Sequence, residues 1–313
     1  MTFMETRVPI SQNKAISNDQ DATSEVFTNL RAVILLAGVV RNTKFNESID
    51  RSVIGLPLDE ETNLIRHWYQ QTCALAKTCA GGSLPLRVLV DPQSRLPQTP
   101  QASDVSPLLI ERDPLEFRGT GGVLFDATAT YGENDYVLVG NGACLLLTDL
   151  GVLVANLARC GADIALLAQP DGSPTGIMLV RCGTLRQISP IGFVDLNEQA
   201  LPSIATKHTV RVLRYAVERY SVRNLTEYTH ALRQFHLNRQ SGRTTDDPFA
   251  ENWLSAFRIA EDPKAIAPSA SLLDSVVLQG GQVQADAIVV RSIVCPGAIV
   301  RAGATMIDEI ITD

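Results

Sequence analysis

The feature that most restricts the fold is a six-residue repeat between residues 265 and 313 of this 313-residue chain. Its apolar positions form two series: Val277, Val283 and Val289, then Ile293, Ile299, Thr305 and Ile311. A six-residue period is too long for one face of an α-helix or for a simple hairpin. It is typical of a β-solenoid, in which each six-residue step is one flat side of a triangular coil. An ordinary β-sandwich fragment is the alternative, and the two phased series argue against it.

The repeat is short for a solenoid. At roughly 18 residues per coil it provides only two or three coils. Such a stub exposes an unpaired strand edge, which usually needs a cap or a partner subunit. We therefore expect a homo- or hetero-oligomer that forms through this tail.

The preceding residues alternate short apolar runs with helical patterns. Strands are expected in RAVILLAGVV, LPLRVLVD, NDYVLVGNG and ADIALLAQ, and two more in TGIMLV and around IGFVDL. Helices are expected over 59–78, from Thr148 or Asp149 to about residue 159, and over 204–240. This alternation predicts an α/β, Rossmann-like domain with a mostly parallel sheet. Ligands bind at the carboxyl ends of such strands, which places Gly38, Asn141 and Gly142 at the mouth of the site.

Changes in sequence texture divide the chain into four segments. Residues 1–28 are polar without periodicity and are expected to be a flexible arm. Residues 29–240 are expected to form the α/β domain, 241–264 a linker with a short helix, and 265–313 the β-solenoid tail.

Composition excludes several classes of protein. With 45% hydrophobic residues and a formal net charge of −7, the chain can bury a core and lacks the basic footprint of a nucleic-acid binder. Its longest apolar run, 32–40, is shorter than the roughly 20 residues of a membrane span. The start has no apolar stretch like that of a signal peptide, and the six cysteines lack a metal-binding spacing. We expect a cytoplasmic protein with reduced thiols and with neither nucleic acid nor membrane as partner.

The loop after the first expected strand, LLAGVVRNTKF, lies where an α/β protein would hold phosphates. It contains one glycine, Gly38, followed by two valines whose side chains keep the backbone away from a phosphate. Arg41, Lys44 and Arg51 follow and could neutralise phosphate charge. The alternative is that they are solvated loop cations.

The order of segments resembles that of the sugar-phosphate nucleotidyltransferases, or NDP-sugar pyrophosphorylases. LLAGVVRNTKF resembles their L-A-G-G-x-G-T-R-L loop, and residues 50–53 stand in place of P-K-P-L. RGTGGVL at 118–124 resembles the G-T-A-G-A-L segment that faces the nucleotide base. LVGNGACLL resembles the strand end that reads n-G-D, and the six-residue repeat resembles the left-handed β-helix tail of several members. The resemblance covers roughly residues 31–313.

This resemblance implies a three-layer nucleotidyltransferase domain and an in-line reaction of a nucleoside triphosphate with a sugar 1-phosphate that releases pyrophosphate. It implies catalytic roles for Lys44 and Arg51, whose charge would stabilise the phosphates. It implies a Mg²⁺ ion held by two aspartates. It implies nucleotide binding by Gly38, Arg41, Gly119, Thr120, Gly121, Gly122, Asn141 and Gly142.

The chain departs from the family pattern where the chemistry takes place. Ala143 replaces the aspartate of n-G-D, and the position matching the second metal aspartate is Arg223. A methyl group cannot coordinate Mg²⁺, and an arginine has the wrong charge for a metal ligand, although a fixed cation could stand in for the metal. The loop glycines are mostly replaced, and the E-K-P segment that helps hold the sugar is missing. The metal ligands are therefore expected to be absent.

Two functions stay open on the sequence: an active nucleotidyltransferase with an altered site, and a catalytically degenerate regulatory or scaffolding subunit. An acyltransferase with hexapeptide repeats is disfavoured because the tail lacks the histidine base of such enzymes. Nucleophilic catalysis by Cys144 is disfavoured because no histidine is near it in sequence. Metal binding by His230 and His236 is disfavoured because their spacing does not place them on one helix face.

Overall fold

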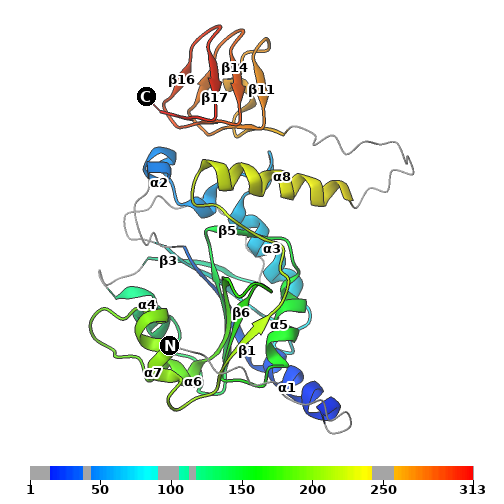
Figure 1. Cartoon of the computed structure of the whole chain (residues 1–313), viewed down its shortest axis with the longest axis vertical. Coiled ribbons are helices and arrows are strands. Elements are labelled where there is room, and N and C mark those ends of the chain that lie inside the picture. Colours follow the sequence, from blue (N-terminus) through cyan, green and yellow to red (C-terminus); the bar gives the residue numbers. More distant parts are fainter. Residues whose placement is uncertain (1–14, 38–43, 91–105, 113–117, 242–256, 313) are drawn as a thin grey trace.

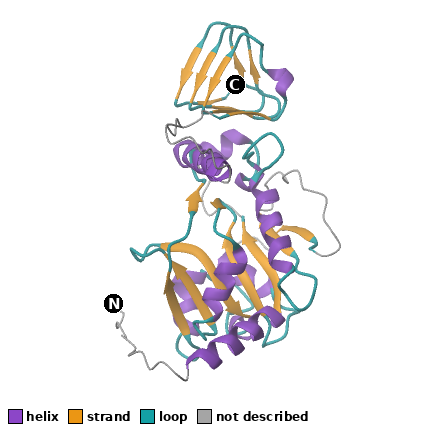
Figure 2. Cartoon of the chain, turned by 90° about the vertical axis from the view of Figure 1, so that its right-hand side faces the viewer, coloured by secondary structure: helices purple, strands orange, loops and turns teal. Residues whose placement is uncertain are grey.

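The computed structural model describes residues 15–37, 44–90, 106–112, 118–241 and 257–312. It contains a layered α/β part, a helix α8 (Leu225–Ser241) across one end of that part, and a β-helix beyond the helix (Figures 1 and 2). Helix α1 (Ala15–Asn29) and the β-helix lie at opposite ends of the molecule (Figure 1).

A seven-stranded sheet with the order β3-β2-β1-β4-β7-β6-β8 forms the centre of the α/β part. All neighbours pair in parallel except β7, which is antiparallel to both β4 and β6. The strands are β1 (Leu30–Leu36), β2 (Leu86–Val90), β3 (Leu108–Arg112), β4 (Tyr136–Asn141), β6 (Ile164–Ala168), β7 (Pro174–Arg181) and β8 (Val210–Arg214). The predicted α/β fold with a mostly parallel sheet is confirmed.

Helices cover both faces of this sheet, because strand β1 alternates its side chains between two cores. Val33 and Leu35 pack in the core that includes α1, α3 and α5, whereas Ala32 and Ile34 pack in the core that includes α4, α6 and α7. The predicted cap Asp149 begins α5, since its Oδ1 accepts from the Val152 amide at 3.0 Å. The helices are α3 (Leu64–Ala76), α5 (Leu150–Ala158), α4 (Gly119–Ala127), α6 (Cys182–Leu185) and α7 (Leu201–Ile204).

Three predictions for this part are wrong. The flexible arm expected over residues 1–28 is a helix from residue 15 on, because residues 15–29 form α1 and bury Val26. Residues 1–14 lie outside the described ones. The segment around IGFVDL is a loop followed by the π-helix η2 (Leu196–Ala200), not a strand. Residues 204–240 contain strands β8 and β9 (Arg219–Ser221) before α8. Strand β8 is an edge strand of the sheet and pairs in parallel with β6, and its alternation of apolar and basic residues is typical of a strand rather than of a helix.

The tail is a three-sided parallel β-helix, as predicted. Successive coils are offset by 17 residues, as from Ser271 to Ile288 and on to Thr305. One side consists of β10 (Arg258–Ala260), β12 (Ser275–Val277), β15 (Ile293–Val294) and β18 (Ile310–Ile311). The others consist of β11 (Ser271–Leu273), β14 (Ile288–Val290) and β17 (Thr305–Ile307), and of β13 (Gln282–Val283) and β16 (Ile299–Val300).

The second apolar series of the repeat was predicted one residue out of phase at Ile293, Ile299 and Thr305, whereas its last member, Ile311, does lie inside the β-helix. Val289 is followed inside the β-helix by Val294 and Val300, while Ile299 is half exposed on the outside. A coil of 17 residues has one side shortened by one residue, so a strict period of six cannot continue around it.

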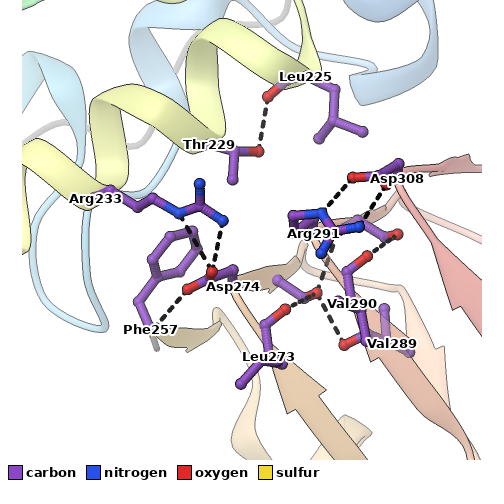
Figure 3. A network of polar contacts seen from close by, with 12 residues as sticks. Leu225, Thr229, Arg233, Phe257, Leu273, Asp274, Val289, Val290, Arg291 and Asp308 are labelled. Atoms are coloured by element: carbon purple, nitrogen blue, oxygen red, sulfur yellow. Dashed lines mark hydrogen bonds and ion pairs between the residues drawn. The ribbon is translucent and has the colours of Figure 1, made fainter. Parts of the chain in front are cut away.

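The shortened side ends at a tight corner. Asp274, Arg291 and Asp308 stack there in successive coils with left-handed backbone angles (φ 49°, 47° and 58°). The Arg291 and Asp308 side chains form a two-pronged ion pair along this stack (Figure 3).

The β10-β12-β15-β18 side packs against the rest of the molecule. Ile259, Val276 and Ile293 lie in the same hydrophobic core as Tyr228 and Leu232 of α8. Strand β10 lies inside the predicted linker 241–264, and the 3-10 helix η3 (Pro263–Ala265) lies at the end of that linker. Residues 242–256 of the linker lie outside the described ones, so its expected short helix stays a prediction. The tail and the α/β part therefore share a core.

Within the described residues, no helix is both long enough and apolar enough to cross a membrane. The six cysteines are unpaired, and four of them are buried. Burial raises the pKa of Cys182 to about 12 and that of Cys295 to about 11, which disfavours the reactive thiolate.

Candidate functional site

The candidate site begins where strands β1 and β4 end. Asn141 pairs with Leu36 across the two parallel strands, and the Gly142 amide donates to the Leu36 carbonyl at 2.9 Å. A Cβ on Gly142 would come within 2.8 Å of the Ala37 Cβ, so the segments that follow β1 and β4 approach more closely than a side chain at Gly142 allows. Asn141 uses its own Oδ1 to accept from the Ala143 amide at 2.8 Å. Both predicted residues therefore shape this strand end.

The two positions expected to hold a metal lie side by side. Strand β5 (Cys144–Leu146) pairs antiparallel with β9, with Cys144 opposite Ser221. One step further, the Val222 amide donates to the Ala143 carbonyl at 3.0 Å, and Arg223 follows directly. The fold thus brings together the two positions that sequence matching assigned.

Arg223 forms an ion pair with Glu227 at this point. Arg223 donates to Glu227 through Nε at 3.1 Å and through Nη2 at 2.8 Å. Partial burial alone would raise the pKa of Glu227, but its hydrogen bonds from Arg223 outweigh that effect and leave the pKa lowered. The local carboxylate is therefore ionised and already neutralised by an arginine.

This donor set does not fit Mg²⁺. The ion prefers an octahedral shell of oxygens, with one or two carboxylates supplied by the protein. Ala143 offers a methyl group at one of the two positions, and Arg223 offers a cation at the other. No group of three or more His, Cys, Asp and Glu side chains in the described part of the chain could hold a metal ion.

The segment with the predicted catalytic cations lies beside Gly142. A Cβ on Gly142 would lie 3.3 Å from Ile54 Cδ1, in the helix η1 (Val53–Gly55). Lys44 begins helix α2 (Lys44–Ile49), and Arg51 lies between α2 and η1. Gly38 and Arg41 lie outside the described residues.

Arg51 is engaged with the tail. Its Nη1 lies 2.6 Å from Oε1 of Glu261, the residue after β10, and the two side chains are only 18% and 23% exposed. The guanidinium that was predicted to bind phosphate is therefore already paired with a carboxylate of the protein itself.

The predicted base-binding residues Gly119–Gly122 form the first turn of helix α4, and the segment 192–196 lies against them. Gly119 has φ +67°, and a Cβ there would lie 2.5 Å from the Val194 carbonyl oxygen. The Gly121 amide donates to that same oxygen at 2.9 Å. Close packing within the chain thus requires these glycines, while their role in nucleotide binding stays a prediction.

The same segment makes two further polar contacts with this turn. Thr120 Oγ1 accepts from the Leu196 amide at 3.0 Å. The buried Arg118 donates to the Gly192 carbonyl at 3.1 Å, and a Cβ on Gly122 would come within 3.1 Å of the Arg118 guanidinium. The turn is therefore held by segment 192–196 and by the Arg118 side chain.

The sequence analysis did not identify the groups that accept hydrogen bonds from these arginines and backbone amides. They are the carboxylates of Glu227 and Glu261 and the carbonyl of Val194. Glu227 follows Arg223 by four residues, which is the spacing of an ion pair on a helix, so this contact had a detectable signal. Glu261 is 210 residues from Arg51, and Val194 belongs to a segment expected to be a strand. No local pattern indicates either contact.

No family model matches this sequence, and no curated protein does either. The solved structures similar to it include HddC from Yersinia pseudotuberculosis, at 11% identity and a TM-score of 0.48 over 66% of this chain and 99% of that one. Another is a Bacillus anthracis protein assigned as a glucose-1-phosphate thymidylyltransferase, at 12% and 0.49 over 66% and 95%. A third is a homologue of Mycobacterium tuberculosis rv0371c from Mycobacterium sp. strain JC1, at 16% and 0.46 over 67% and 98%.

Proposed function

We propose that this chain is a catalytically degenerate nucleotidyltransferase-type protein that acts as a regulatory or scaffolding subunit of an oligomeric complex. The observation that carries the proposal is the pairing of Ala143 with the strand end that leads into Arg223. The family resemblance implies two aspartates that anchor a metal at this point, and this chain has an alanine and an arginine at the matched positions.

The energetic consequence is large. A metal ion that clamps transferring phosphates supplies several kcal/mol of transition-state stabilisation. Each loss of about 1.4 kcal/mol slows a reaction tenfold, so losing the clamp costs several decades of rate. Arg223 cannot take over this role while Glu227 neutralises it.

Phosphate binding without turnover is compatible with the same site. Lys44 and Arg51 are cations on the segment beside Gly142, and a nucleotide or sugar phosphate is the ligand class that they suit. We expect weak binding of such ligands and no dependence of that binding on Mg²⁺.

The test is a turnover assay of the full chain. Pyrophosphate release is measured with ATP, GTP, CTP, UTP and dTTP, each with a panel of sugar 1-phosphates and Mg²⁺. We expect no release above the protein-free rate. Mg²⁺-dependent turnover at a rate of at least about 1 per second, which is ordinary for an enzyme, overturns the proposal.

A further inference from the structure

The contact between Arg51 and Glu261 joins the candidate site directly to the β-helix. Glu261 follows β10, and its amide donates to the Val277 carbonyl at 3.1 Å. Its Oε2 accepts from the Gln279 amide at 2.6 Å, while its Oε1 faces Arg51 at 2.6 Å. Hydrogen bonds to the first coil of the β-helix therefore orient the Glu261 carboxylate toward Arg51.

Two other polar contacts of α8 connect it to the β-helix and to the α/β part. Arg233 of α8 forms an ion pair with Asp274 of the β-helix at 2.7 Å (Figure 3). On the other side of α8, the buried Tyr228 hydroxyl donates to the Pro57 carbonyl. Arg51 and Glu261 differ because they link the predicted phosphate-binding segment to the tail without an intermediate.

A carboxylate and a phosphate compete for the same donors of a guanidinium. Both are oxyanions that accept charge-assisted hydrogen bonds, and an Nη1 already bonded at 2.6 Å is not available to a second anion at full strength. An unpaired charge is costly in a half-buried position, so loss of the Glu261 carboxylate is expected to increase the affinity of Arg51 for another anion.

We propose that Glu261 acts as an internal anion that competes with phosphate-bearing ligands for Arg51, so that ligand binding and docking of the tail oppose each other. The inference rests on the proposed function, because it takes the segment around Arg51 as the phosphate-binding one. Coupling of this kind is reciprocal: whatever loosens the contact of the tail strengthens ligand binding, and a bound ligand loosens the tail by the same factor.

The first experiment measures the affinity for inorganic pyrophosphate and for ATP by calorimetry. It compares the wild type with Glu261→Gln, which keeps the size of the side chain and an acceptor for the Gln279 amide. We expect Glu261→Gln to bind pyrophosphate about tenfold more tightly. The matched control is Glu309→Gln, which removes an exposed carboxylate at the far end of the tail and is expected to change nothing.

The second experiment follows hydrogen exchange of the backbone amide of Gln279, because this N–H donates a hydrogen bond to the Glu261 carboxylate. Saturating pyrophosphate is expected to speed its exchange in the wild type and to have no effect in Arg51→Gln. Unchanged exchange in the wild type with bound pyrophosphate overturns the competition.

The outcomes separate the two proposals. Equal pyrophosphate affinity of the wild type and Glu261→Gln overturns the competition and leaves the proposed function in place. Absence of pyrophosphate and ATP binding in both proteins overturns the competition and the phosphate site of the proposed function together.

Discussion

At the scale of single residues, Gly119 is a described position where the backbone leaves little room for a side chain. Its φ of +67° disfavours any side chain, and the Val194 carbonyl would lie 2.5 Å from a Cβ. We expect Gly119→Ala to lower the free energy of unfolding by at least about 2 kcal/mol, measured by urea denaturation. Gly161 is the matched control, because it has φ +55° with nothing within 4 Å, and its change to Ala should cost about 1 kcal/mol. Equal losses would show that segment 192–196 does not press on the turn.

Two partly buried histidines, His67 and His236, predict how stability changes with pH. Burial lowers the pKa of His67 and of His236, and His236 stacks on Phe257 with 5.6 Å between ring centres. Around His236, Asp59 and Asp274 oppose this shift and Arg239 adds to it. A lowered folded-state pKa means that the unfolded chain takes up the proton first as the pH falls. Stability is therefore complete above the unfolded pKa of about 6.5 and declines as the pH falls through the folded-state pKa.

The corresponding measurement is urea unfolding at pH values from about 7 to about 5, a window above the range where ordinary carboxylates titrate. We expect the wild type to lose stability across this window and His236→Phe, which keeps an aromatic ring beside Phe257, to lose less. His230→Phe changes an exposed histidine and serves as control. Identical slopes in the wild type and His236→Phe would remove His236 from the explanation.

Sequence matching assigned residues to the candidate site, and their roles there stay predictions. Of their partners, Glu227 has a local signal because it follows Arg223 by four residues, whereas Glu261 has none. Ala143 and Arg223 were matched to the two metal positions, and the strands bring those positions together. Glu261 reaches Arg51 only because a third part of the chain folds over α8, and such a contact leaves no trace in local spacing.

At the scale of elements, the β-helix offers a direct test of its phase. Val300 is fully buried inside, whereas its neighbour Ile299 is 50% exposed. We expect Val300→Ala to lower the free energy of unfolding by about 2 kcal/mol, because it leaves a cavity in a packed interior. Ile299→Ala should cost less than about 0.5 kcal/mol. Urea denaturation of both variants decides, and a larger loss for Ile299→Ala would restore the strict six-residue phase.

The elements that were predicted correctly are those with a strong local signal. The apolar runs of β1, β4 and β6, the cap at Asp149 and the repeat of the tail are all of this kind. Helix α1 was missed because its sequence is mostly polar, and among its described side chains only Val26 and Phe27 pack against the core. Strand β8 was missed because it was included in the longer segment expected to be helical, although its alternating apolar and basic residues favour a strand.

At the scale of the whole molecule, the sequence predicts an oligomer, and the structure locates exposed apolar groups on the tail. Leu273, Ile288 and Ile307 are 44–49% exposed on the β11-β14-β17 side, while the β10-β12-β15-β18 side is covered by the rest of the chain. We expect light scattering at micromolar concentration to give a mass above the 33.9 kDa of one chain. Ile307→Lys should lower this mass, and Glu133→Lys on the α/β part should not. A mass of one chain for the wild type would contradict the prediction.

The central claim is that the site has lost the acidic groups that anchor a cation, and Mn²⁺ in place of Mg²⁺ tests it most directly. Electron paramagnetic resonance measures free Mn²⁺ during titration with ATP and either the wild type or the double variant Ala143→Asp/Arg223→Asp. We predict that the double variant binds Mn²⁺ with ATP at least about tenfold more tightly than the wild type. We also predict that the wild type binds no more Mn²⁺ than ATP alone does. Tight binding of Mn²⁺ by the wild type, equal to that of the double variant, would contradict the account.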